Sequence, residues 1–159
     1  MLPPPLAEFD AYFALLEVGS LVQHGVEQQL RAEGGLSFVQ FQILAILGES
    51  EDRTQTMTTV ADRLVHSRSG LTYQAQKLES AGLITRTTGP DDDRTTILTL
   101  SPAGAALLAR VLPGHMDVVR DILLDALGEA DRTELTRILD KVRVHMRSRP
   151  PRSARRKRS

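Results

Sequence analysis

The sequence contains no cysteine and no tryptophan, and it has only two tyrosines and four phenylalanines among 159 residues. Without cysteine there is no disulfide, no thiolate metal site, no thiol redox switch and no cysteine nucleophile. Leu, Ala and Arg are abundant instead, and these residues fill helices at little steric or entropic cost. The composition favours a mainly α-helical protein, and the length suits a single domain over residues 1–159.

Long apolar runs are also missing. None approaches the roughly 20 residues that cross a bilayer. The first residues, Met1–Leu6, are rich in proline, whereas a secretion signal has a basic region followed by an apolar one. We therefore expect no membrane partner and a place in the cytoplasm.

The net charge is zero, but the charges are unevenly distributed. The first 146 residues carry all 20 acidic residues and 13 of the 20 basic ones, so their net charge is −7. Because so acidic a body does not attract DNA as a whole, a DNA site must be a local group of Lys and Arg. The basic tail, residues 150–159, is expected to be disordered. It either raises DNA affinity through phosphates or only keeps the chain soluble.

Apolar residues recur every three or four positions over about Leu6–Arg31, which predicts a long amphipathic helix. Two glycines inside it each cost about 1 kcal/mol relative to alanine, so packing against a partner surface must hold it together. Ser37 and Gln40 then have the spacing of a capping box, which predicts a second helix over Phe38–Leu47. Its expected core face is Phe41, Leu44, Ala45 and Leu47.

Two short helices with a tight turn between them follow. Thr58 is the expected cap of the first, and Ser67 is the expected cap of the second, which spans about Arg68–Ala81. A helix, a three-residue turn and another helix have the spacing of a helix-turn-helix.

Two runs rich in β-branched residues, Leu83–Thr88 and Thr95–Leu100, come next, and turn-forming residues separate them. They predict a two-stranded hairpin. A helix-turn-helix followed by such a hairpin is a winged helix, and we expect it to occupy about residues 36–100.

The remainder of the chain is predicted to be helical. Ser101 and Pro102 suit the N-cap and the first position of a helix that apolar periodicity extends to Leu127. Pro113 predicts a kink in it rather than an end. A last helix is expected over Glu129–Met146.

The apolar stripes of the first and the last two helices exceed what one small monomer covers. We therefore expect residues 6–35 and 101–147 to form the dimerisation lobe of a homodimer.

The second helix of a helix-turn-helix fits the DNA major groove, which is about 12 Å wide. On this helix Leu71, Ala75 and Leu78 fall on the side expected to be buried. The polar residues expected to contact DNA are Ser67, Arg68, Ser69, Thr72, Tyr73, Gln76 and Lys77. After the Ser67 cap, the hydroxyl and amide side chains suit base edges, whereas Arg68, Lys77 and, on the first strand, Arg86 suit phosphates. Gly70 either allows close approach to a groove wall or is merely tolerated near a helix end.

The hairpin loop carries Asp92 and Arg94 at its tip. Arg94 can enter the minor groove, whose negative potential attracts a guanidinium, and Asp92 can hold that side chain by a charge-assisted hydrogen bond. The alternative is that residues 90–94 are only a solvated turn.

In the order of its elements the sequence resembles the MarR family of bacterial winged helix-turn-helix transcription regulators, over about Leu6–Met146. The motifs that carry the resemblance are the capped second helix, Ser67–Thr72, Asp92-Asp93-Arg94 and Leu100–Gly104. The resemblance implies a homodimer in which the first, fifth and sixth helices interleave. It further implies two recognition helices on successive major grooves of a palindromic operator in double-stranded DNA.

Members of that family commonly repress transcription and release DNA when a small aromatic or amphipathic compound binds in the cleft between the two lobes. The apolar residues available there are Phe13, Leu16, Phe41 and Leu44, although each alone also suits an ordinary core. No two of the four histidines lie three or four residues apart, so no helical pair of metal ligands is expected, and no cofactor is predicted.

Sequence signatures of catalysis are absent. There is no nucleophile elbow, no phosphate-binding glycine loop and no HExxH motif, so we expect no enzyme. The alternative function is a helical protein-interaction dimer whose winged helix no longer binds DNA. A salt-dependent DNA gel shift separates the two.

Overall fold

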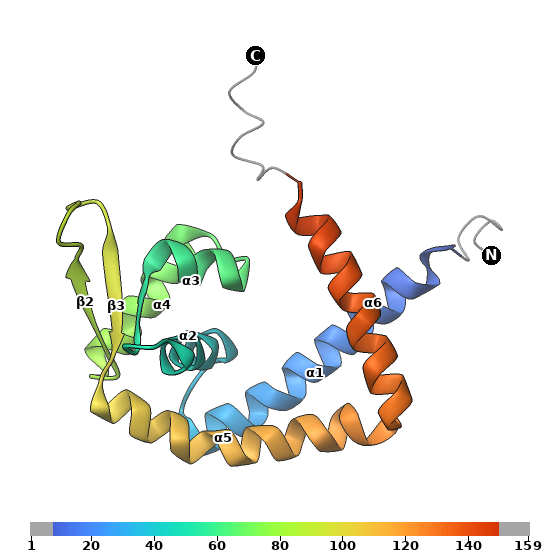
Figure 1. Cartoon of the computed structure of the whole chain (residues 1–159). Helices are drawn as coiled ribbons and strands as arrows, with labels where there is room; N and C mark the ends of the chain where they lie inside the picture. Colours follow the sequence, from blue (N-terminus) through green and yellow to red (C-terminus); the bar gives the residue numbers. More distant parts are fainter. Residues whose placement is uncertain (1–7, 150–159) are drawn as a thin grey trace. The chain divides into compact units, whose positions relative to one another are not determined.

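The computed structural model describes residues 8–149. The fold is mainly helical with a small antiparallel sheet, as the sequence predicts (Figure 1). In chain order the elements are α1 (Asp10–Gly34), α2 (Phe38–Glu49), β1 (Thr54–Thr56), α3 (Met57–Leu64), α4 (Arg68–Ser80), β2 (Ile84–Thr88), β3 (Thr96–Leu100), α5 (Pro102–Ile122) and α6 (Glu129–Arg147). The basic tail and the proline-rich start lie outside the described residues.

The chain forms two compact units, one ending at Val119 and the other beginning at Arg120. The first contains the winged helix together with α1 and most of α5. The second contains the end of α5, a single 3-10 turn over Leu124–Ala126, and α6. No helix in the described part of the chain is long and apolar enough to span a bilayer.

Side-chain caps begin the helices of the winged helix. The capping box of α2 is present: Ser37 Oγ accepts from Gln40 N–H at 3.2 Å, and Gln40 Oε1 accepts from Ser37 N–H at 3.0 Å. The expected Thr58 cap of α3 is wrong. Thr56 is the cap, and its Oγ1 accepts from Thr59 N–H at 3.1 Å. Since β1 ends at Thr56, its extended backbone already has the geometry that an N-cap requires.

The sheet has three strands in the order β1-β3-β2, where the sequence predicted the hairpin of β2 and β3. Thr54 of β1 pairs with Thr99 of β3, and their hydroxyl oxygens lie 3.0 Å apart. The added strand ties the start of α3 to the hairpin, so the wing is fixed to the helix-turn-helix at its base.

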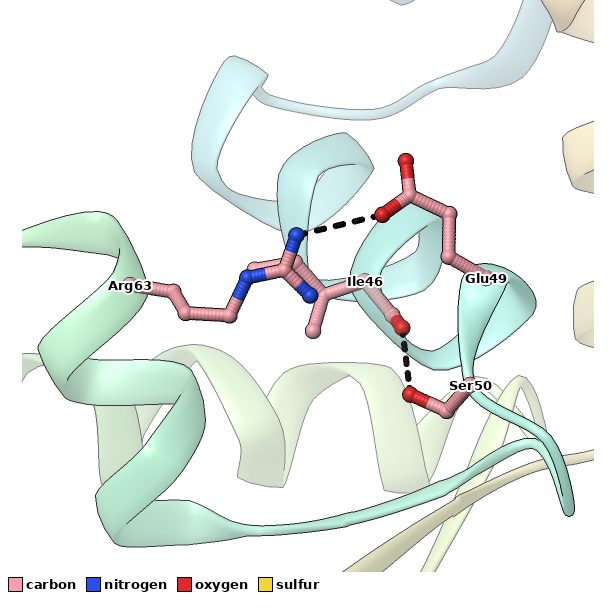
Figure 2. Close-up of polar contacts among 4 residues, drawn as sticks. All are labelled: Ile46, Glu49, Ser50 and Arg63. Carbon is pink, nitrogen blue, oxygen red and sulfur yellow. Dashed lines mark hydrogen bonds and ion pairs between the residues drawn. The ribbon is translucent and has the colours of Figure 1, made fainter. Parts of the chain in front are cut away.

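Helix α2 lies at the centre of the core. Besides the buried residues expected on one face, Ile43 and Ile46 are buried as well, whereas Ala45 is only partly buried. At its C-terminal end Ser50 Oγ donates to the Ile46 carbonyl at 2.8 Å, and Arg63 of α3 donates to Glu49 at 3.1 Å (Figure 2). The ion pair is exposed and adds little stability.

Helix α5 is continuous through Pro113 and ends at Ile122, earlier than the sequence indicated. Ser101 fixes its start, because Ser101 Oγ accepts from Gly104 N–H at 3.0 Å and donates to the Gly82 carbonyl at 2.6 Å. The first turn of α5 is therefore attached to the turn that follows α4.

Candidate nucleic-acid interface

Helix α4 has one buried and one exposed side. Leu71, Ala75 and Leu78 are at most 1% exposed, as predicted, and they pack in the core. The opposite side carries most of the predicted DNA contacts, and the exposed ones are Ser67, Arg68, Ser69, Tyr73, Gln76 and Lys77. Thr72 is half-buried, and its hydroxyl donates to the Arg68 carbonyl at 2.8 Å, so only its oxygen lone pairs remain for a ligand.

The first turn of α4 depends on its cap. Ser67 Oγ accepts from Gly70 N–H at 3.2 Å. A Cβ at Gly70 would lie 3.0 Å from that oxygen and 3.4 Å from Nδ1 of His66. The missing side chain leaves room for the cap, which is a reason within the protein for glycine at this position.

Two exposed side chains on α4 contact each other. The Lys77 ammonium lies 4.7 Å from the centre of the Tyr73 ring, within the range of a cation–π contact.

A hydrogen bond joins α4 to α2. The amide oxygen of Gln74, a residue that the sequence did not single out, accepts from Gln40 Nε2 at 3.2 Å.

Arg86 has a different environment from the one expected. Its guanidinium donates twice to the Glu79 carboxylate, at 3.1 Å for each bond, and its side chain is only 25% exposed. The bidentate hydrogen bonding also holds the pKa of Glu79 below its ordinary value. Arg86 thus joins the end of α4 to β2, and its charge is already compensated within the chain.

The wing loop is closed by hydrogen bonds of its main chain. Gly89 N–H donates to the Thr95 carbonyl at 2.7 Å, and Asp92 Oδ1 accepts from Arg94 N–H at 2.9 Å. Asp92 was expected to hold the Arg94 guanidinium, but it binds the main chain of the loop instead. Arg94 is exposed, and within residues 8–149 its guanidinium forms no ion pair.

The four residues expected to line an effector cleft are not brought together as a group. Phe41 and Leu44 belong to the core, at 5% and 0% exposure, whereas Phe13 and Leu16 on α1 are about half exposed, at 50% and 51%. The expected lining combined a core pair with a surface pair, because apolar periodicity alone does not tell a core face from an uncovered one.

A buried polar group lies where α1, α2 and α5 meet. Gln29 Nε2 donates to the Val111 carbonyl at 3.1 Å and to Glu33 at 2.9 Å. Its Oε1 and His115 Nδ1 are buried without a hydrogen-bond partner among the described residues. The His115 ring lies 4.3 Å from the ring of Phe41, and burial lowers the pKa of His115. The sequence signal that was missed is a glutamine at a position of the apolar stripe of α1.

Comparison with known proteins identifies the fold. The family model described as MarR family matches residues 34–95. The structure resembles AbsC, a MarR family transcriptional regulator from Streptomyces coelicolor, with 31% sequence identity and a TM-score of 0.84, over 94% of this chain and 99% of that one. The chain belongs to the MarR family.

Two further similar proteins are informative. Sco3205 from Streptomyces coelicolor, solved in complex with DNA, is 30% identical, with a TM-score of 0.79 over 83% of this chain and 82% of that one. The transcriptional regulator PecS of Dickeya dadantii is 31% identical over 112 residues, which are 70% of this chain and 67% of PecS. This MarR-family chain is therefore a transcriptional regulator and not an enzyme.

Proposed function

We propose that this MarR-family protein binds double-stranded DNA sequence-specifically as a homodimer, with α4 in the major groove and the β2–β3 loop in the adjacent minor groove. The observation that carries the proposal is the division of α4 into a fully buried apolar side and an exposed side of hydroxyl, amide and basic groups. Exposed polar groups on a rigid helix are what base-edge recognition requires.

The roles divide by chemistry and exposure. Tyr73 and Gln76 lie three residues apart on one face and are assigned to base edges. Arg68 and Lys77 are assigned to phosphates. Arg94, whose guanidinium forms no ion pair with another described residue, is assigned to the minor groove. Arg86 is not assigned to DNA, because Glu79 already occupies its guanidinium.

Support for the proposed dimer comes from apolar residues that the single chain leaves exposed. Within the first unit the largest group of them lies just before and along the first half of α1, and its members are between 44% and 62% exposed: Phe9, Tyr12, Phe13, Leu15, Leu16, Val18 and Leu21. Within the second unit α6 buries none of its residues, although Leu135, Ile138, Leu139 and Val142 form one stripe. A second copy of this chain is the partner we assign to both surfaces, and its symmetry implies a palindromic operator.

The protein is proposed to act in the cytoplasm as a repressor that a small aromatic or amphipathic compound releases from DNA. The support is that Gln29 Oε1 and His115 Nδ1 are buried without a hydrogen-bond partner among residues 8–149, and that the His115 ring lies beside the Phe41 ring. Unsatisfied buried polar atoms are costly, and a hydroxyl group on an aromatic ring, which can donate to Gln29 Oε1 or bond to His115 Nδ1, would satisfy such an atom.

A salt series in a gel shift with duplex DNA tests DNA binding. A regulator that contacts several phosphates loses affinity steeply as salt rises, and its operator competes better than random duplex. A protein-interaction dimer whose winged helix no longer binds DNA would shift neither duplex.

Effector relief has its own test. A panel of phenols and hydroxybenzoates is added to the DNA-bound protein, and one of them should release wild type while it fails to release Phe41→Leu or Gln29→Leu. Both variants should bind the operator normally without ligand. If no compound changes the melting temperature or the DNA affinity, the regulator is not controlled through this group of residues.

A further inference from the structure

Val65 has a backbone conformation that branched residues avoid. It follows α3 with φ 53° and ψ 39°, in the left-handed region. Its N–H donates to the Asp62 carbonyl at 3.2 Å, and His66 N–H donates to the Ala61 carbonyl at 3.0 Å, which closes the helix in the manner of a Schellman motif. Glycine is the usual residue at this position, because a branched Cβ clashes with the main chain there.

At two other helix ends with a left-handed backbone this chain has glycine. Gly35 after α1 and Gly82 after α4 have φ values of 62° and 74°. The other non-glycine residue with positive φ among the described residues, Arg53, is not β-branched. Val65 is therefore an exception to the pattern of this chain, and its side chain needs a reason of its own.

Burial does not supply that reason. Val65 is 83% exposed, more than any other large apolar residue that the structure describes. The isopropyl group of Val65 is thus an exposed apolar surface on a strained backbone. Neither the exposed surface nor the strain stabilises the fold. Strain that the fold does not use tends to persist at functional sites.

The position of Val65 suggests its use. It lies in the turn between α3 and α4, two residues before the Ser67 cap of the recognition helix. Just beyond the cap, Arg68 Nη2 lies 3.5 Å from the Arg94 carbonyl in the wing loop. The exposed methyl groups are thus at the end of α4 that meets the wing.

We propose that Val65 contacts the C5-methyl group of a thymine at the edge of the major groove and thereby adds one base to the recognised sequence. The thymine methyl is the one apolar group that a base presents in this groove, and a stiff branched side chain on a closed turn meets it at little entropic cost. This inference rests on the proposed DNA binding.

The test uses duplexes selected from a random library by the full-length wild-type protein. Val65→Asn, which suits the left-handed conformation, should raise the melting temperature by about 2–4 °C. Val65→Ala keeps the Cβ and should gain little. Both should lower operator affinity about three- to tenfold, as expected for the loss of one or two buried methyl groups. A rise in stability together with a fall in affinity is the signature of a functional residue.

Replacement of single thymines by deoxyuracil identifies the contact. Wild type should lose affinity at one position in each half-site, and the Val65→Asn protein should be indifferent at that position. Equal affinity of all three proteins would overturn the inference, as would a lower melting temperature of Val65→Asn or variants that remain sensitive to every uracil. If wild type selects no duplex, the proposed DNA binding itself fails, and that result is distinct from all of these.

Discussion

The winged helix and α6 both carry apolar residues at helical spacing, but these residues have opposite fates in the single chain. In the winged helix the apolar residues of α2 and α4 close into one core with the sheet, and several are fully buried. In α6 the apolar residues form a stripe along one side, yet no residue of the helix is buried. A periodic stripe therefore shows that a face is to be covered, but it does not say whether the same chain covers it. The winged helix is complete in one chain, and we infer that α6 needs a second.

The largest expected effect follows from a charge in the α6 stripe. Ile138→Asp places a carboxylate where we propose the partner chain packs, so it should convert a dimer of about 35 kDa into a monomer of 17.5 kDa. Operator affinity should fall at least about a hundredfold, because two half-sites no longer bind together. Light scattering at micromolar concentration and a gel shift measure the two effects.

Val144→Asp is the matched control for this variant. Val144 is 68% exposed and lies about two and a half turns beyond Leu135, hence on the opposite side of α6. The same charge there should leave both mass and affinity unchanged. A wild-type monomer, or equal effects of the two variants, would show that the stripe is not the interface.

Within the winged helix, Gln76→Ala should separate recognition from folding. The residue is exposed on α4 and supports nothing in the core, so the melting temperature should stay within about 1 °C of wild type. Operator affinity should fall by about 1–3 kcal/mol with little change on random duplex, and preference should relax at one base pair in each half-site. Equal losses on both duplexes would assign Gln76 to the DNA backbone.

Arg94→Ala should have a smaller and less selective effect. Affinity should fall on all duplexes, most where the flanking minor groove is narrow and rich in A·T, and the salt slope should decrease by about one unit per subunit. Asp92→Ala should loosen the loop and reproduce part of the affinity loss, while the salt slope stays near that of wild type, because Asp92 holds only main chain. An affinity profile over salt for the three proteins decides between these roles.

The smallest effect is expected at the Glu79–Arg86 pair. Glu79→Arg or Arg86→Glu should lower the melting temperature by a few degrees, and the double exchange should recover most of the loss. Because Arg86 lowers the folded-state pKa of Glu79 from 4.5, the pair stabilises the fold above about pH 4.5 and loses this effect as pH falls through the lowered pKa. The difference in melting temperature between wild type and Glu79→Gln should therefore vanish in acid. If the double exchange recovers stability and leaves the salt slope of DNA affinity unchanged, Arg86 has this structural role and does not contact a phosphate.

Much of the fold could be predicted from local signals. The capping box at Ser37 and the buried side of α4 depend on neighbouring residues alone, and the structure confirms both. The sequence left open whether the polar stretch Gly48–Thr56 ends in a short strand, because the three polar residues of β1 acquire strand character only by pairing with β3. The burial of Ile43 was missed for a similar reason, since a helix covered on nearly all sides has no one-sided pattern.

For the site residues too, local sequence signals predicted exposure, whereas contacts between distant segments could not be predicted. Exposure of Gln76 and Lys77 follows from their place opposite the buried side of α4. The partners of charged groups did not follow, since Glu79 meets Arg86 only once β2 packs beside α4, and Asp92 turns to the main chain because the loop closes on itself. Long-range packing decides which charges remain free for DNA.

The most direct test of the central claim is selection of duplexes from a random library by the wild-type dimer. We expect enrichment of an inverted repeat whose half-sites lie about one helical turn apart, about 10 base pairs from centre to centre, and loss of that enrichment with Gln76→Ala. Recovery of random sequences by a protein that is folded and dimeric would contradict it.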